Sequence, residues 1–332
     1  MDIPTESEFL SIFENMKGLV LKSTGSWYKV LAEKDQKHYS CNIKGHFRTR
    51  GIKTTNPIAV GDFVDFEKSE KEEFTGIIYN IHDRKNYIVR KSINLSKQYH
   101  IIASNIDQLA LVVTLKSPQT STMFIDRYLL TAEAYGIPTT IIFNKIDLLI
   151  SEQEKQMLKN EIKKYNKIGY QTLEISVLEN INTDQLKKVF KNKVSLISGH
   201  SGVGKSTIMN HIEPNLNIQT AEISDSFSRG KHTTTFAEMH PLSYGGFIID
   251  SPGIKSFSVV DINKEEYYTY FRELFSASHD CKFHNCLHLK EPGCEVKRRV
   301  ESLQIHPNRY RNYLHIYHSD NENYRSGPKN LE

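Results

Sequence analysis

One segment constrains the fold of this chain more than any other: Gly199-His200-Ser201-Gly202-Val203-Gly204-Lys205-Ser206, followed by Thr207. It matches G-x-x-x-x-G-K-[ST], a phosphate-binding loop that requires a strand before it and a helix after it. An apolar run precedes the segment and a helical pattern follows it. The glycines let backbone N–H groups face a phosphate, Lys205 reaches the β- and γ-phosphates, and Ser206 can ligate Mg²⁺. A plain glycine-rich turn is the alternative.

The surrounding residues alternate between buried strands and helices. Helical spacing marks residues 123–136 and 151–169, and strands of continuous apolar character are expected at 108–115, 138–145, 170–176, 194–199 and 245–250. Continuous apolar strands are typical of a parallel sheet covered on both faces. The alternation therefore predicts a doubly wound α/β sheet around the phosphate-binding loop.

A base-reading motif follows the second of these strands: Asn144-Lys145-Ile146-Asp147. Guanine carries two adjacent N–H donors, and the carboxylate of Asp147 can accept a hydrogen bond from each of them. Adenine would leave this carboxylate unpaired, which is costly. Asn144 would hold the loop and the purine edge, and the aliphatic stem of Lys145 would cover one face of the base. Together with the phosphate-binding loop, the motif indicates a guanine nucleotide; a simple polar turn is the alternative.

Two further segments have the character of γ-phosphate sensors. Asp250-Ser251-Pro252-Gly253 follows a strand, which would place Asp250 near Mg²⁺ and the Gly253 N–H near the γ-phosphate. Residues 230–235 contain three consecutive threonines, of which we expect Thr234 to supply a second Mg²⁺ ligand. An exposed strand edge is the alternative for the threonine run.

The motifs stand in an unusual order. N-K-x-D comes before the phosphate-binding loop, which comes before D-x-x-G, whereas most GTPases have the phosphate-binding loop first and N-K-x-D near the end. The order predicts a circular permutation of the same sheet. The switch segments, about 221–258, then continue directly into the C-terminal region, and we expect nucleotide state to move that region.

The C-terminal region contains cysteines and a histidine at a spacing typical of metal ligands: Cys281-x₄-Cys286-x-His288-x₅-Cys294. With four cysteines in the whole chain and no export signal, we expect reduced thiols that bind one structural zinc ion as a Cys₃His set. Chance clustering is the alternative. The remaining cysteine, Cys41, lies in a strand pattern and is expected to be a buried apolar residue.

The N-terminal part contains five short alternating strands, expected at 18–23, 27–32, 38–43, 62–68 and 75–81. They predict a small β-barrel, of which the OB-fold is the common nucleic-acid-binding type and an SH3-like barrel the alternative. Basic residues accompany aromatics here and near the C-terminus, as RNA binding would require. They are Lys44, Arg48, Arg50 and Lys53, then Lys85, Arg90 and Lys91 within the stretch Arg84–Lys97, and then Lys297, Arg298, Arg299, Arg309 and Arg311 beside Tyr310 and Tyr313. A solvated charged face is the alternative.

Composition and the distribution of apolar residues exclude several classes of protein. Hydrophobic residues make up 38% and charged residues 25%, as in ordinary globular proteins. The net charge of +4 is too small to argue for nucleic acid by itself. There is no apolar run long enough to cross a membrane and no basic, apolar leader at the start, so we expect a cytoplasmic protein without membrane contact.

Taken in order, these motifs resemble the RsgA (YjeQ/EngC) family of circularly permuted GTPases, which depend on the small ribosomal subunit. The resemblance runs from about residue 17 to 320 and implies four segments: an extension at 1–16, an RNA-binding OB-fold at 17–92, a permuted GTPase at 93–260 and a helical zinc-binding domain at 261–332. It implies hydrolysis of GTP, with Mg²⁺, to GDP and phosphate when stimulated by that subunit. It also implies a late role in 30S biogenesis with rRNA contact. Nothing in the sequence demands more than a monomer. An RNA-binding checkpoint gated by nucleotide, with incidental hydrolysis, is the alternative.

One departure from most GTPases bears on catalysis. The residue after D-x-x-G is Ile254, where many GTPases carry a glutamine that orients the attacking water. Isoleucine cannot do this. His232, in the segment Gly230–Thr235, is the candidate, and the resemblance implies that catalytic role for it. A role in shaping the switch segment is the alternative.

Overall fold

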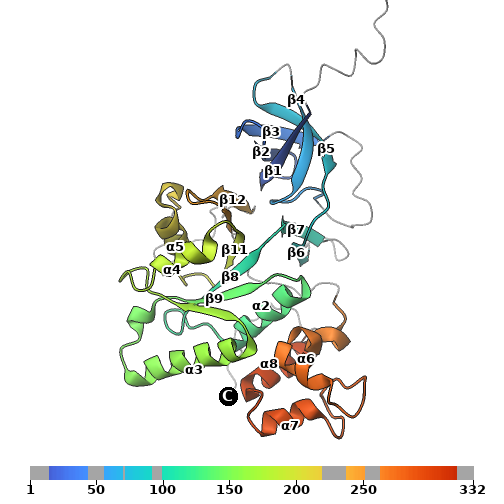
Figure 1. The fold of residues 1–332 in the computed structure, drawn as a ribbon, viewed down its shortest axis with the longest axis vertical. Coiled ribbons are helices and arrows are strands. Elements are labelled where there is room, and N and C mark those ends of the chain that lie inside the picture. Colours follow the sequence, from blue (N-terminus) through green and yellow to red (C-terminus); the bar gives the residue numbers. More distant parts are fainter. Residues whose placement is uncertain are drawn as a thin grey trace, which may run out of the picture.

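The computed structural model of the chain describes residues 15–43, 56–69, 72–91, 99–218, 237–250 and 262–319. Figure 1 shows a small barrel at one end, an α/β layer in the middle and a group of helices at the other end.

The barrel is a closed sheet of five strands. They are β1 (Asn15–Ser23), β2 (Tyr28–Ala32), β3 (His38–Ile43), β4 (Phe63–Lys68) and β5 (Thr75–Ile81). Their order is β1-β2-β3-β5-β4, β4 pairs back with β1, and β3 lies parallel to β5. This is the OB arrangement, which confirms the predicted barrel. Cys41 is fully buried in its core beside Tyr28 and Phe66, as expected.

An antiparallel hairpin that the sequence patterns did not predict connects the barrel to the central sheet. It consists of β6 (Tyr87–Lys91) and β7 (Tyr99–Ser104). Of the basic residues expected on the barrel, Lys44, Arg48, Arg50 and Lys53 lie outside the described residues.

The central sheet contains the predicted strands in a doubly wound order. They are β8 (Gln108–Val113), β9 (Thr139–Phe143), β10 (Gln171–Glu174), β11 (Val194–Ser198), β12 (Glu238–Pro241) and β13 (Phe247–Asp250). The spatial order is β10-β9-β8-β11-β13-β12. All neighbours are parallel except β12, a short edge strand that runs antiparallel to β13. The sequence patterns missed β12, and the other five strands were predicted.

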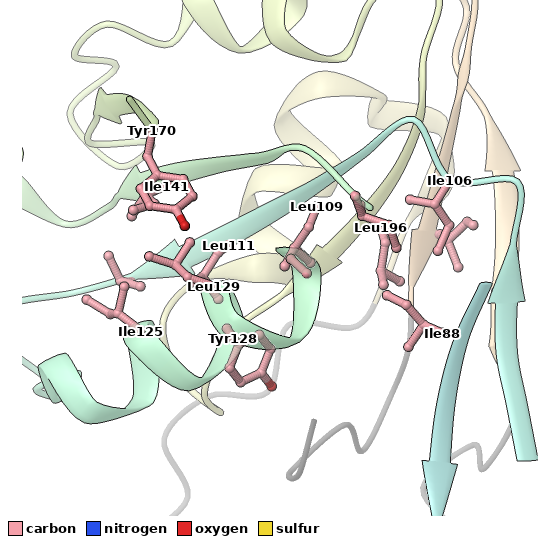
Figure 2. Packing of buried hydrophobic residues seen from close by; sticks show 14 of the residues in the cluster. Ile88, Ile106, Leu109, Leu111, Ile125, Tyr128, Leu129, Ile141, Tyr170 and Leu196 are labelled. Atoms are coloured by element: carbon pink, nitrogen blue, oxygen red, sulfur yellow. The ribbon is translucent and has the colours of Figure 1, made fainter. Parts of the chain in front are cut away.

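Helices cover both faces of this sheet, and each face has its own apolar core. They are α2 (Thr122–Ala134), η1 (Ile146–Leu148), α3 (Glu152–Ile168), α4 (Asp184–Phe190), α5 (Lys205–Ile212) and η2 (Pro214–Leu216). Figure 2 shows Ile125 and Leu129 of α2 packed near Leu111 and Ile141 of the sheet. The long polar helix α3 begins with a capping box between Ser151 and Glu154, which satisfies N–H groups of its first turn.

The C-terminal region is helical, as predicted, and residues 262–319 contain no strand. Its elements are η3 (Lys264–Tyr270), α6 (Arg272–Ser278), α7 (Glu295–Glu301) and α8 (Pro307–Ser319). Tyr267, Phe271 and Tyr313 form its buried core together with Leu130 of α2, so the region shares its core with the central domain. In the part of the chain that the structure describes, no helix is long and apolar enough to span a membrane.

A buried ionic network fixes α8 to α2 and corrects one expectation. Arg309 is 1% exposed. Its guanidinium donates to Asp126 Oδ1 at 2.6 Å and to Glu273 Oε1 at 2.6 Å. Burial disfavours its charge, but these two carboxylates hold the pKa of Arg309 well above its usual value. The prediction that Arg309 and the buried Tyr313 lie on an RNA-binding surface is therefore wrong.

Two more arginines of that expected basic face are engaged in surface ion pairs. Arg298 donates to both carboxylate oxygens of Glu295 at 2.6 Å. Arg299 pairs with Glu295 and, at 2.5 Å, with Asp280. The positive charge of α7 is therefore largely balanced by its own neighbours, and Arg311 is the exposed arginine of α8.

Candidate nucleotide-binding site and metal centre

The sheet topology brings the two nucleotide motifs to one edge. The phosphate-binding loop follows β11 and the N-K-x-D segment follows β9, with β8 between them. Because these three strands are parallel, their carboxyl ends meet at the same edge, where ligands bind in open α/β sheets. Residues that are far apart in the sequence therefore lie in one site.

A direct hydrogen bond joins the two motifs. Asn144 Nδ2 donates to the carbonyl of Val203 at 2.8 Å. A side chain at Gly204 (φ +96°) would place its Cβ 2.4 Å from that same amide nitrogen. A Cβ at Gly199 (φ +148°) would lie 2.2 Å from the carbonyl oxygen of Val112. Both glycines are thus required by backbone conformation and by close packing of the loop.

Lys205, at the start of α5, closes the phosphate-binding loop on itself. Its ammonium group donates to the carbonyls of Gly199 at 2.9 Å and His200 at 2.7 Å. Burial lowers the pKa of Lys205, and the nearby carboxylate of Asp250 acts in the opposite direction. Asp250 is the last residue of β13 and pairs in register with Ile197 of β11. The predicted Mg²⁺ residue therefore lies beside the loop.

Asp147 has a carboxylate oxygen that no described residue donates a hydrogen bond to. Its Oδ1 is buried and accepts no hydrogen bond from the described residues, and the same holds for Asn144 Oδ1. Buried polar atoms are normally paired, so an unpaired carboxylate oxygen fits a ligand N–H. Lys145 has a left-handed backbone (φ +61°), and its ammonium group donates to the carbonyl of Ser117 at 2.7 Å. The loop after β8 therefore supports the loop after β9.

Two parts of this site were missed by the sequence patterns. Ser176, fully buried, follows β10 at the same edge, next to the Asp147 segment: the N–H of Ile146 donates to the carbonyl of Ile175 at 3.3 Å. The position of a strand end beside β9 could have revealed it. The second is Phe124 of α2, whose ring stacks on that of His200, with centroids 3.6 Å apart. Burial lowers the pKa of His200, which favours the neutral imidazole in this stack.

Three predicted site residues lie outside the described residues: His232, Thr234 and Gly253. The remaining nucleotide residues, 144–147, 199–207 and 250, are all described and lie at or next to the carboxyl edge of the sheet.

The four predicted metal ligands converge. The donor atoms of Cys281, Cys286, His288 and Cys294 all lie within 4.8 Å of one another. His288 Nδ1 lies 3.7 Å from the sulfur of Cys281 and 3.5 Å from that of Cys294. Burial lowers the pKa of His288 to about 4, so its imidazole is neutral at physiological pH, as metal binding requires. The cluster can hold a metal ion.

Residues outside the ligand pattern shape the loop that carries it. Tyr310 donates its hydroxyl to the carbonyl of His288 at 2.6 Å, and Tyr313 donates to that of Leu287 at 2.6 Å. The carboxylate of Glu291 accepts from the N–H groups of Leu287 and Leu289 at 2.9 and 2.7 Å. The sequence pattern assigned both tyrosines to RNA binding and gave no role to Glu291.

Comparisons with known proteins agree with this geometry. Residues 81–260 match the family model for the RsgA GTPase, and residues 17–78 match that for the RsgA N-terminal domain. The "Small ribosomal subunit biogenesis GTPase RsgA" of Flavobacterium johnsoniae is 54% identical over 313 residues, which covers 94% of this chain and 95% of the relative. The protein of that name from Christiangramia forsetii is 53% identical over 311 residues, covering 93% of this chain and 98% of the relative.

Solved structures give the same result. The crystal structure of YjeQ from Thermotoga maritima superimposes with a TM-score of 0.74 and 31% identity, covering 92% of this chain and 98% of the other. YloQ, described as a circularly permuted GTPase, superimposes with a TM-score of 0.70 and 29% identity, covering 92% and 94%. The permuted order of the motifs is therefore matched by a known fold.

Proposed function

Because the chain belongs to the RsgA family of GTPases, we propose that it is a biogenesis factor of the small ribosomal subunit. It is a GTP-hydrolysing enzyme. We propose that the subunit stimulates this hydrolysis late in its own assembly, and that the protein works in the cytoplasm, where that assembly takes place. Both predicted sites are built from a single chain, which supports a monomer as the working unit.

We propose that Asp147 selects guanine. The supporting observation is its buried, unpaired Oδ1, beside a loop that Asn144 ties to the phosphate-binding loop. The carboxylate would accept the adjacent N–H donors of guanine, and the backbone at Ser176 and Val177 would lie along the base. Adenine has no donor at these positions and would leave Asp147 unpaired.

The phosphates would bind the backbone of residues 199–207, with Lys205 exchanging its two loop carbonyls for phosphate oxygens. Ser206, Asp250 and Thr234 would hold the Mg²⁺ that accompanies GTP and neutralises its charge, and the Gly253 N–H would sense the γ-phosphate. Residues 146, 200–203 and 207 complete the proposed binding loops.

We propose that His232 orients the attacking water, since the glutamine position holds Ile254. Replacing this histidine, in His232→Ala, is expected to leave nucleotide affinity unchanged and to abolish the stimulated turnover. Parallel titrations and turnover assays measure the two effects. Unchanged stimulated turnover would contradict the assignment.

The metal in the Cys₃His cluster is proposed to be a single structural zinc ion. Three soft thiolates and one neutral imidazole are typical zinc ligands, and four protein donors leave no open position for catalysis. The tyrosine and glutamate contacts to the ligand loop support a fixed geometry. Metal analysis of the purified protein should give one zinc per chain.

We propose that residues 17–92 and 261–332 flank a GTPase domain at 93–260, after an extension at 1–16, and that the two flanking domains bind rRNA. On the barrel, Trp27, Phe63 and Tyr79 are 48%, 41% and 37% exposed, as bases stacking on a barrel surface would require. Because Arg309 and Tyr313 are buried, the proposed RNA contacts of the C-terminal domain must come from other residues of that domain.

The experiment that tests this function is steady-state GTP turnover with and without purified small ribosomal subunits. A strong stimulation is expected. Tight GTP binding with no stimulation would contradict the proposal and favour an RNA-binding module gated by nucleotide.

Base selectivity is tested by Asp147→Asn, with Asp184→Asn as the control at an exposed aspartate of α4. The amide can donate where the carboxylate accepts, so preference should move from guanine to xanthine nucleotides. The expected loss of GTP affinity is about 10- to 100-fold. Competition binding with GTP and XTP measures it, and retained GTP selectivity would contradict the base-reading argument.

A further inference from the structure

A cavity of about 350 Å³ lies between the C-terminal half of α3 and the turn before α8. Because α3 runs back from the carboxyl edge of the sheet to the start of β10, this cavity lies at the edge opposite the nucleotide loops. Its volume is in the range of small-molecule sites. Its lining comes from both the GTPase domain and the C-terminal domain, and none of its residues belongs to the sites described above.

The charged lining consists of Lys163, Lys164 and Lys167, with Glu273 as the acidic residue, and a histidine, His306, completes the polar lining. Glu273 is already engaged, because its two oxygens accept from Arg309 at 2.6 and 3.1 Å. Lys164 is likewise engaged, by Glu161 at 2.5 Å, whereas Lys163 and Lys167 form no ion pair with the described residues. The cavity therefore has an excess of positive charge and suits an anion.

The histidine presents a proton donor. His306 Nδ1 accepts from the N–H of Asn308 at 3.2 Å, which places the proton of the neutral ring on Nε2. Lys167 donates to the carbonyl of Gln304 at 3.1 Å, which holds the turn against α3. Donors from both domains thus line one opening.

The apolar lining consists of Ile168, Ile305 and Leu303. Leu303 is 69% exposed and has a left-handed backbone (φ +58°) directly after α7. Glycine adopts this conformation with less strain and is the common residue at such a helix end. The chain therefore carries an exposed leucine side chain at the rim of a cationic cavity, at a position where glycine would be more stable.

We propose that this cavity binds a phosphate-bearing nucleotide, with its base against Leu303, Ile305 and Ile168. The phosphate would pair with Lys163, Lys167 and His306 at the rim, because an ammonium group and a phosphate form strong charge-assisted hydrogen bonds. The amides of Asn160 and Gln304 also line the opening and would contact the polar edge of the base. The nucleotide is either free or part of a single-stranded RNA.

The test uses the full-length protein saturated with GDP, so that the guanine site is filled. Adenosine monophosphate and a short oligoadenylate serve as probes, titrated calorimetrically. Binding of the mononucleotide as tightly as the oligomer identifies a free nucleotide as the source, and clearly tighter binding of the oligomer identifies RNA.

Two variants must each weaken the binding of the tighter probe by about tenfold or more. Lys163→Glu reverses the charge of an unpaired lysine, and its matched control is Lys159→Glu, one turn earlier on α3 and outside the cavity. Leu303→Gly removes the apolar contact while relieving the backbone, so its urea midpoint should not fall. Basal GTP turnover should be unchanged in all of them.

Absence of binding by both probes would overturn the proposal. So would unchanged affinity in Leu303→Gly and Lys163→Glu, or an equal loss in the Lys159→Glu control.

Discussion

The barrel and the C-terminal domain are fixed to the central sheet by the same device, a buried arginine–aspartate pair, but at different places. The barrel's Asp62, fully buried, accepts from Arg84 at 2.6 Å and from the hydroxyl of Ser104 at 2.6 Å. These partners lie on the chain between the barrel and β8. In the C-terminal domain, Arg309 instead pairs with Asp126 on α2, a helix of the central domain itself.

The two attachments differ in how directly they connect to the phosphate-binding loop. On α2, Phe124 stacks on His200 of the phosphate-binding loop, and Thr122 accepts from Asn312 of α8 at 3.2 Å. Asp126 also accepts from Asn312, at 2.6 Å. One helix therefore contacts both the nucleotide loop and the C-terminal domain. The described barrel residues instead reach the sheet through the hairpin, the edge strand β12 and an apolar cluster that includes Leu19 and Leu21 of β1.

This comparison refines the expectation that nucleotide state moves the C-terminal domain. Separating α8 from α2 would break the Arg309–Asp126 pair and leave the buried Asp126 without its cationic partner, which costs about 3–5 kcal/mol. The C-terminal domain is therefore expected to move together with α2. The barrel is joined to the edge strand β12 by one register pair, between Lys22 and Glu238, and contributes Leu19 and Leu21 to the apolar core of the sheet. Because no buried ion pair ties the described barrel residues directly to the sheet or to its helices, we expect the barrel to have more freedom to move against the sheet.

Metal removal should have the largest effect, because it should destabilise the C-terminal domain and leave the barrel unchanged. The described part of the barrel has no cluster of metal donors, whereas a structural zinc site contributes about 10 kcal/mol of binding free energy. A chelator is expected to unfold the loop 281–294 and α7 and to leave the barrel folded. Thermal unfolding followed by circular dichroism should lose one transition, and an identical curve with and without chelator would contradict this.

Breaking the C-terminal attachment comes next. Arg309→Ala leaves two buried carboxylates without their partner and should lower the free energy of unfolding by about 3–5 kcal/mol. Urea denaturation measures it. The matched control is Arg311→Ala, an exposed arginine of the same helix, with an expected change within about 0.5 kcal/mol. Equal effects in both variants would show that the buried network does not fix the domain.

The barrel's edge contact should matter least. Lys22 and Glu238 pair at 2.7 Å, but their side chains are 34% and 33% exposed, and solvent screens such pairs. Lys22→Ala should therefore cost only about 0.2–1 kcal/mol, against Lys29→Ala as an exposed control on β2. A loss as large as that of Arg309→Ala would remove the contrast between the two attachments.

Local patterns predicted most of the fold. Alternation marked the five barrel strands, continuous apolar runs marked the buried parallel strands, and the cysteine spacing predicted a cluster whose donors converge. The sequence patterns missed the hairpin β6–β7 because the basic residues of this stretch pointed to an RNA-binding surface rather than to strands. The edge strand β12 was missed because four residues carry too little periodicity.

The burial of Arg309 could not be predicted in the same way. An arginine among tyrosines in a basic stretch has the composition of a nucleic-acid-binding surface. Its partner Asp126 is 183 positions away in the sequence, and only the packing of α8 on α2 brings the two together. The stack of His200 on Phe124 has the same cause, since it depends on which helix follows β8 at the loop's edge.

The most direct test of this account is amide hydrogen exchange of the full chain with GDP and with a non-hydrolysable GTP analogue. If the C-terminal domain moves together with α2, then α8 should change its protection no more than α2 does between the two states. Faster exchange confined to residues 307–319, with α2 unchanged, would show that the C-terminal domain separates from α2 and would contradict the account.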